Sequence, residues 1–105
     1  MNKNVIIGCI YAAFMWISCS DPGQQNPVGA IPEGSTIFRK NCVVCHGADG
    51  KLGMNGAKDL SMSVLPLEER INTITNGRNV MTPFKALLSP EEIKAVAQYT
   101  LSLKK

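Results

Sequence analysis

The distribution of apolar residues divides the chain into three parts. Residues 5–17 are almost continuously apolar and follow a short polar start that contains Lys3. Residues 20–31 are rich in Pro, Gly and polar residues without apolar periodicity, which is typical of a flexible tether. From residue 33 onward, apolar residues recur at helical spacing in short segments. We therefore predict one all-α domain over residues 33–105.

The first helix is predicted over residues 33–42. Pro32 stands just before it, and Ile37 and Phe38 supply its apolar face. Gly34 has no obvious local role there, because glycine weakens a helix. The close approach of another helix would explain this glycine, and fraying of the helix end is the alternative.

Two further helices have clear start and stop signals. Pro66 opens one of them, and Asn76 and Gly77 end it. Its apolar residues follow the i, i+4, i+7 pattern: Leu67, Ile71 and Ile74. Ser89 and Pro90 begin the other, with a capping box completed by Glu92 and an apolar stripe formed by Ile93, Val96, Ala97, Thr100 and Leu101. Beside that stripe, Tyr99 either contacts the first helix near Phe38 or faces solvent.

A C-V-V-C-H motif at residues 42–46 carries the clearest chemistry. Two thiols at this spacing, followed directly by a histidine, attach a c-type haem: Cys42 and Cys45 form thioethers and His46 binds the iron. A redox-active thiol pair usually belongs to a strand-helix-strand pattern, which the sequence lacks. A zinc site needs a fourth ligand, but His46 is the only histidine and the other two cysteines lie far upstream. The sequence therefore predicts one covalent haem c.

The stretch after His46, residues 47–62, contains four glycines with Asp and Asn between them. We predict a loop here and not a phosphate cradle, because no strand precedes it and no Gly-Lys-Ser/Thr ending follows. One backbone carbonyl of this loop would accept the free ring N–H of His46 and fix its orientation. The sequence does not identify which carbonyl.

The size and charge of the chain bear on its need for a cofactor and on its partners. About seventy residues follow Pro32, a size at which an apolar core alone is marginal and a covalent group acts as a staple. Eleven Lys and Arg stand against eight Asp and Glu, without a basic run, so we predict no nucleic-acid partner. We assign most of the scattered basic residues, which include Arg39, Arg70 and Lys85, to a solvated surface.

The N-terminal segment predicts export. Residues 1–18 combine a positive start with an apolar run that is too short to span a bilayer, as in an export signal. Ser18 and Cys19 at its end resemble the lipobox of bacterial lipoproteins. We therefore predict a signal peptide over residues 1–18, and a lipidated Cys19 with a tether over residues 19–32 that holds the domain at the periplasmic side of the membrane. An uncleaved anchor and an ordinary secreted signal are the alternatives.

An iron bound by His46 has one axial position left. Met81 lies in a short non-helical segment before Pro83, from which its thioether can reach the far face of a haem. The alternative role for Met81 is to fill a gap in the core, and Met62 is the reserve ligand. Arg78 either pairs with a haem propionate, because a guanidinium matches a carboxylate fork, or faces solvent.

Taken together, residues 33–105 resemble a small single-haem cytochrome c of class I. The resemblance rests on C-V-V-C-H and the G-A-D-G after it, L-E-E-R-I leading to N-G-R, M-T-P-F at 81–84 and L-S-P-E-E-I at 88–93. It implies three main helices around the haem, with the first and last crossing, Cys42 and Cys45 carrying the haem, His46 as proximal ligand and Met81 as distal ligand. Thr82 departs from the pattern, because many members have proline directly after the methionine.

A haem with both axial positions filled by protein leaves no place for a small-molecule substrate at the iron. We therefore predict that the protein is an electron carrier and not an enzyme. It would exchange single electrons with redox proteins such as a respiratory reductase or oxidase. One alternative is a subunit through which electrons enter a larger respiratory oxidase or reductase. The other, if Met81 does not ligate, is a haem protein that reacts with a gas or peroxide.

Overall fold

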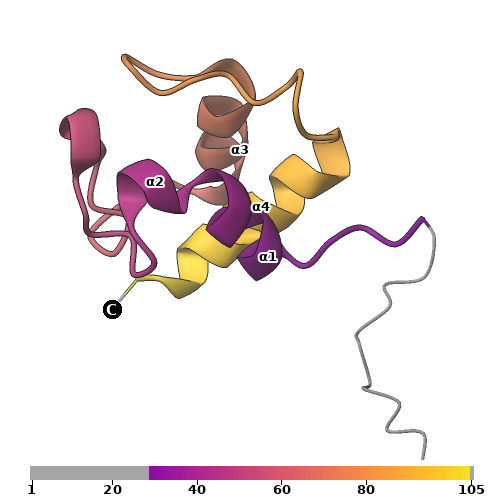
Figure 1. Cartoon of the computed structure of the whole chain (residues 1–105), viewed down its shortest axis with the longest axis horizontal. Helices are drawn as coiled ribbons and strands as arrows, with labels where there is room; N and C mark the ends of the chain where they lie inside the picture. The colour runs from indigo at the N-terminus through magenta and orange to yellow at the C-terminus, as the bar shows by residue number, and fades with distance from the viewer. Residues whose placement is uncertain (1–28, 105) are drawn as a thin grey trace, which may run out of the picture.

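Helices and loops make up the fold, which the computed structural model describes for residues 29–104. The elements are α1 (Gly34–Asn41), α2 (Val43–His46), the 3₁₀ turn η1 (Met54–Gly56), α3 (Leu67–Asn76) and α4 (Pro90–Ser102). In Figure 1, α4 crosses α1 and lies against α3, and the loops extend outward from this unit. Residues 29–104 contain no strand, so the all-α prediction is confirmed, and α1, α3 and α4 are the three main helices it named.

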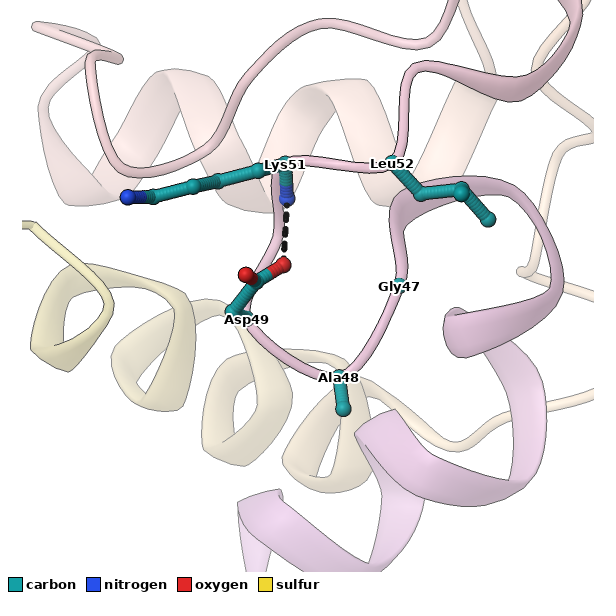
Figure 2. A pocket seen from close by; sticks show the side chains of 5 residues that line it. All are labelled: Gly47, Ala48, Asp49, Lys51 and Leu52. Carbon is teal, nitrogen blue, oxygen red and sulfur yellow. Dashed lines mark hydrogen bonds between the residues drawn. The ribbon is translucent and has the colours of Figure 1, made fainter.

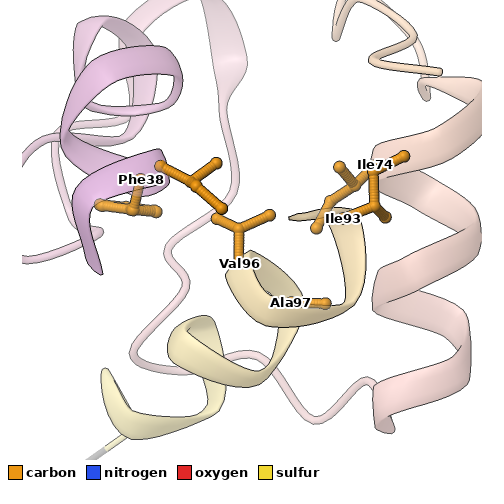
Figure 3. Packing of buried hydrophobic residues seen from close by; sticks show 6 residues of the cluster. Phe38, Ile74, Ile93, Val96 and Ala97 are labelled. Carbon is orange, nitrogen blue, oxygen red and sulfur yellow. The ribbon is translucent and has the colours of Figure 1, made fainter. Parts of the chain in front are cut away.

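A small apolar cluster holds the three main helices together. Phe38 of α1 and Val96 of α4 belong to this cluster, Ala97 of α4 extends toward α3, and Ile74 of α3 lies beside Ile93 of α4 (Figure 3). With Ile37, these are the six hydrophobic residues buried in the described part of the chain. The core is therefore centred on α4, the helix that contacts both of the others.

The crossing of α1 and α4 depends on Gly34. A Cβ atom at this position would collide with the backbone carbonyl oxygen of Ala95 and would lie 3.0 Å from the Cβ of Tyr99. The Tyr99 ring continues the contact against Phe38, with the ring centroids 5.3 Å apart. Both expectations are confirmed: another helix approaches closely at Gly34, and Tyr99 contacts the first helix.

The start of α4 also agrees with its sequence signals. Ser89 Oγ accepts a hydrogen bond from the Glu92 backbone N–H at 3.2 Å, and the Glu92 carboxylate accepts one from the Ser89 N–H at 2.8 Å. This is the predicted capping box, with Pro90 at the first helical position. The predicted apolar stripe was wrong at Leu101, which is exposed because helical spacing places it at the edge of the stripe.

The predicted signal peptide, the lipobox with Cys19 and most of the tether lie outside the described residues. Among residues 29–104, no helix is long and apolar enough to cross a membrane.

Candidate functional site

The two cysteines of the C-V-V-C-H motif lie on either side of a short helical turn. Cys42 ends α1 and also caps α2: its backbone N–H donates to the Phe38 carbonyl at 2.9 Å, and its own carbonyl accepts from the His46 N–H at 2.9 Å. Cys45 follows one turn later, inside α2. The chain therefore passes from one helix to the next at Cys42 and presents both thiols and the imidazole from one short segment.

Both thiols are free and partly buried. Burial, and to a smaller extent the neighbouring Cys45, raises the pKa of Cys42 to about 11, so this thiol is protonated at neutral pH. A redox-active cysteine of the thioredoxin type instead has a lowered pKa. Within residues 29–104, no group of three or more His, Cys, Asp or Glu side chains is placed to hold a metal ion. The structure therefore favours neither the thiol-pair nor the zinc alternative.

The His46 ring is held by the loop that follows it. Its Nδ1–H donates to the backbone carbonyl of Lys58 at 3.2 Å, which leaves Nε2 as the nitrogen that can bind a metal. Burial lowers the pKa of His46, and the Lys58 hydrogen bond opposes this shift, so the ring is neutral at pH 7. The expectation that a carbonyl of residues 47–62 orients this ring is confirmed, and the structure identifies it as that of Lys58.

Two backbone hydrogen bonds close the loop, one before Lys58 and one after it. The Leu52 N–H donates to the His46 carbonyl at 2.9 Å, and the Leu60 N–H donates to the Gly50 carbonyl at 2.9 Å. Gly50 is required here, because its φ is +80° and a Cβ would lie 2.9 Å from the Leu60 Cβ. These bonds close residues 51–59 into a loop that returns to the motif and places the Lys58 carbonyl beside His46.

An open hollow of about 480 Å³ lies inside the first turn of this loop, beside residues 47–52. Figure 2 shows the Asp49 carboxylate turned toward the Lys51 backbone N–H, from which it accepts a hydrogen bond of 3.0 Å. The side chains of Lys51 and Leu52 extend to opposite sides of the turn (Figure 2). We interpret this hollow as the inside of a tight turn, since its acidic group is already satisfied by local backbone.

Met81 lies in a second tight turn, between α3 and α4. The backbones of Arg78 and Met81 exchange two hydrogen bonds, of 2.9 and 3.3 Å, and Asn79 between them has a φ of +54°. Gly77, with φ +73°, precedes the turn, and a Cβ there would collide with the Met81 carbonyl oxygen. The Phe84 N–H then donates to the Ile74 carbonyl at 2.9 Å, which fastens the loop to α3.

The candidate distal residues differ in burial. Met81 is partly buried and packs against the apolar core. Met62, the reserve ligand, is 75% exposed, and Arg78 is exposed. Cys42 packs against the same core as Met81, so the two predicted halves of the site, the C-V-V-C-H segment and the Met81 loop, contact one cluster.

Sequence reasoning missed Arg70. This residue belongs to the predicted solvated surface but is only 4% exposed in the structure. Its position gave a signal: on α3 it lies three residues after Leu67 and four before Ile74, within the apolar stripe. A charged residue inside such a stripe is directed toward the interior.

The residues around the motif fit a haem. Two free thiols and a histidine with Nε2 available supply the chemistry of covalent attachment and ligation. Several apolar side chains pack on the core with one side and remain partly accessible on the other: Cys42, Leu60, Leu67, Ile71, Met81, Phe84 and Leu88. A buried core of six residues is small for this domain, so a large flat apolar group would complete it.

A smaller hollow of about 130 Å³ lies between α3 and the beginning of α4. Apolar atoms of Ile71, Leu88 and Ile93 line it, with Thr75 and Lys85 at its edge. Pockets that hold small molecules usually measure about 300 Å³ or more, so we interpret this hollow as a packing defect.

Comparison with known proteins gives a consistent result. The family described as cytochrome c oxidase, cbb3-type, subunit III matches residues 29–99. Cytochrome c6 of Gloeothece citriformis is 35% identical, over 94% of this chain and 89% of that protein. The cbb3-type cytochrome c oxidase subunit CcoP of Rubrivivax gelatinosus is 40% identical, over 70% of this chain but only 26% of that subunit. Among solved structures, the KustC0563 c-type cytochrome superposes with a TM-score of 0.63 at 31% identity, over 70% of this chain and all of that one.

Proposed function

Because the chain belongs to the family of small c-type cytochrome domains described as cytochrome c oxidase, cbb3-type, subunit III, we propose that it carries single electrons on a covalent haem ligated by His46 and Met81. Members of the cytochrome c family bind one covalent c-type haem, and cytochromes c6 are electron carriers and not enzymes. The haem supplies an iron that alternates between the ferric and ferrous states. The protein supplies attachment, axial ligands and a surface for redox partners.

The observation that carries the proposal is the hydrogen bond from His46 Nδ1 to the Lys58 carbonyl. It fixes the tautomer and directs Nε2 away from the loop, as a metal-ligating histidine requires. The same segment provides two free thiols at the attachment spacing. A pKa of His46 below its ordinary value keeps the ring in the neutral form that binds metal.

Three features support Met81 as the second ligand. It is partly buried against the core, its backbone is fixed by Arg78, and the flanking Gly77 packs against its carbonyl. A methionine sulfur favours ferrous iron and raises the reduction potential of a haem. We include Arg78 as a partner of a haem propionate, because its guanidinium is exposed on this same turn.

Substitution of the two candidate methionines tests the ligand assignment. We expect Met81→Ala to abolish the far-red sulfur-to-iron absorption band of the oxidised haem protein, because the axial thioether is lost. Met62→Ala is the matched control and should retain the band, since Met62 is 75% exposed. Loss of the band in Met62→Ala with retention in Met81→Ala would reverse the assignment.

A second candidate function is that of a subunit through which electrons enter a larger oxidase. The matched family and the CcoP relative both carry the name of a cbb3-type oxidase subunit. The full chain, purified from its native membrane under mild detergent, separates the two possibilities. A free carrier elutes alone at its own mass, whereas an oxidase subunit elutes with the other subunits of the oxidase.

Export and attachment to the membrane complete the proposal. Residues 1–18 would be removed and Cys19 would carry lipid at the periplasmic face, with residues 19–32 as the tether. Lipid on Cys19 should place the native protein in the membrane fraction. We expect Cys19→Ser to shift the haem protein to the soluble periplasmic fraction with an unchanged visible spectrum. Membrane association that persists in Cys19→Ser after removal of residues 1–18 would exclude lipid on this residue as the anchor.

A further inference from the structure

Arg70 is the one buried charged residue in the part of the chain that the structure describes. It lies on α3 and is 4% exposed, whereas the other Lys and Arg residues of this part are exposed. Burial of a cation is costly unless it is paired and hydrogen-bonded. The surroundings of Arg70 therefore decide whether its charge has a consequence beyond packing.

All three guanidinium nitrogens of Arg70 have partners, and all the partners are neutral. Nε donates to the Leu65 carbonyl at 2.8 Å, Nη2 to the Ser63 carbonyl at 3.0 Å and Nη1 to Thr100 Oγ1 at 3.0 Å. Thr100, itself buried on α4, donates a hydrogen bond from its hydroxyl group to the Ala97 carbonyl at 2.6 Å. The hydrogen bonds give each guanidinium nitrogen an acceptor but do not cancel the positive charge.

The guanidinium remains charged in this position. Burial lowers the pKa of Arg70, but the pKa of arginine is so far above neutral pH that the guanidinium stays protonated in proteins. A neutral side chain of similar volume would avoid the desolvation cost of this charge, and such replacements of buried ions are often neutral or stabilising. The two hydrogen bonds to Ser63 and Leu65 hold segment 63–65 against α3, and the third joins α3 to Thr100 of α4, but none of them requires a net charge.

The charge lies within the same packed unit as the other buried groups of the domain. Arg70 shares α3 with Ile71 and Ile74, and its partner Thr100 lies on the same helix as the core residues Val96 and Ala97. Cys42 and Met81 pack against that core. A domain of this length has a radius of gyration of about 11 Å. A fixed charge inside it therefore acts on any redox centre there with little screening by salt.

We propose that the buried charge of Arg70 raises the reduction potential of the haem that this domain carries. The inference rests on the proposed function. Uptake of one electron from a redox partner lowers the charge of the haem site by one unit, so a nearby positive charge stabilises the reduced form relative to the oxidised form. Arg70 is thus a positioning residue for segment 63–65 and an electrostatic determinant of the potential.

Potentiometric titration of the haem-loaded full chain tests this inference. We expect Arg70→Met to have a lower midpoint potential than the wild type, and Arg70→Lys to recover most of the difference because it keeps the charge. Arg39→Met is the matched control, since it removes the same charge from an exposed position on α1. Its potential should move much less than that of Arg70→Met.

A further variant separates charge from hydrogen bonding. Thr100→Val removes one neutral partner and leaves the guanidinium in place, so its potential should stay within the shift given by Arg39→Met. If Arg70→Met does not fold with haem, Arg70→Gln takes its place, because it removes the charge and keeps hydrogen-bond donors for the neighbouring carbonyls. The inference would be overturned if Arg70→Lys or Thr100→Val lowered the midpoint potential as much as loss of the charge does. It would also be overturned if Arg70→Met and Arg39→Met had equal midpoint potentials. Absence of covalent haem from the wild type would instead overturn the proposed function.

Discussion

Gly34 sets the distance between two helices by having no side chain. The carbonyl of Ala95 on α4 occupies the space that a Cβ would take, and the Tyr99 side chain closes the other side. Sequence reasoning identified this position, because a glycine near a helix start without a cap function implies a close approach. It could not identify the partner, since the contact joins residues about sixty positions apart in the chain.

Replacement of Gly34 by alanine should destabilise the protein, although this substitution usually stabilises a helix. Alanine normally stabilises a helix relative to glycine by about 1 kcal/mol. We expect Gly34→Ala to lower the free energy of unfolding by about 1–3 kcal/mol, because the new methyl group meets backbone and not a movable side chain. Thermal unfolding by circular dichroism measures this. Lys40→Ala, at an exposed position of the same helix, should change stability by less than about 0.5 kcal/mol, and an equal effect of both substitutions would contradict the close contact.

Lys58 shows the limit of prediction at the level of single residues. The sequence indicated that some loop carbonyl would orient His46, because a ligating histidine needs a partner for its second nitrogen. Selection of Lys58 depends on the loop geometry fixed by Gly47 and Gly50, with their positive φ angles, and by the bond from Leu52 to His46. Backbone angles of this kind are set by tertiary contacts and are not encoded in a local pattern.

At the scale of elements, α4 was the most predictable, because its start is encoded locally. Ser89, Pro90 and Glu92 all favour a helix that begins at the same residue. The short helix α2 was not predicted as a separate element. Four residues cannot form a stable helix alone, and α2 exists because α1 ends at Cys42 and the chain turns again directly.

The capping box gives a prediction that belongs to α4. We expect Ser89→Ala to lower the free energy of unfolding by about 1 kcal/mol, since the Glu92 N–H loses its acceptor. Ser89→Asp is the control, because a carboxylate caps equally well and also favours the helix N-terminus. Thermal melts of the three proteins decide the matter. If the Asp variant were as unstable as the Ala variant, the cap would not be the source of the effect.

The loop that carries Met81 combines predictable and unpredictable features. Its place between two helices followed from Gly77 and Pro83, which mark the interruption in the sequence. The pairing of Arg78 with Met81, the left-handed Asn79 and the bond from Phe84 to the end of α3 did not follow. These contacts hold the backbone at Met81 in one conformation, which is the condition for an axial ligand supplied by a loop.

At the scale of the whole molecule, the length of the domain predicted that its apolar core alone would give only marginal stability. The described part buries six hydrophobic residues and one arginine, and it leaves a set of apolar side chains only partly covered. The fold class and the attachment motif could be predicted from the sequence because both are local signals. The burial of Arg70 could not, since it depends on how α3 packs against α4 and on carbonyls from segment 63–65.

The central claim is a haem closed on both faces, by His46 and Met81, that exchanges electrons and binds no external ligand. The most direct measurement is the visible spectrum of the reduced native haem protein before and after addition of carbon monoxide. We expect an unchanged spectrum, because the proposed Met81 ligand would occupy the remaining axial position of the iron. Ready formation of a carbon monoxide complex by the native protein would contradict it and would favour a haem that reacts with a gas or peroxide.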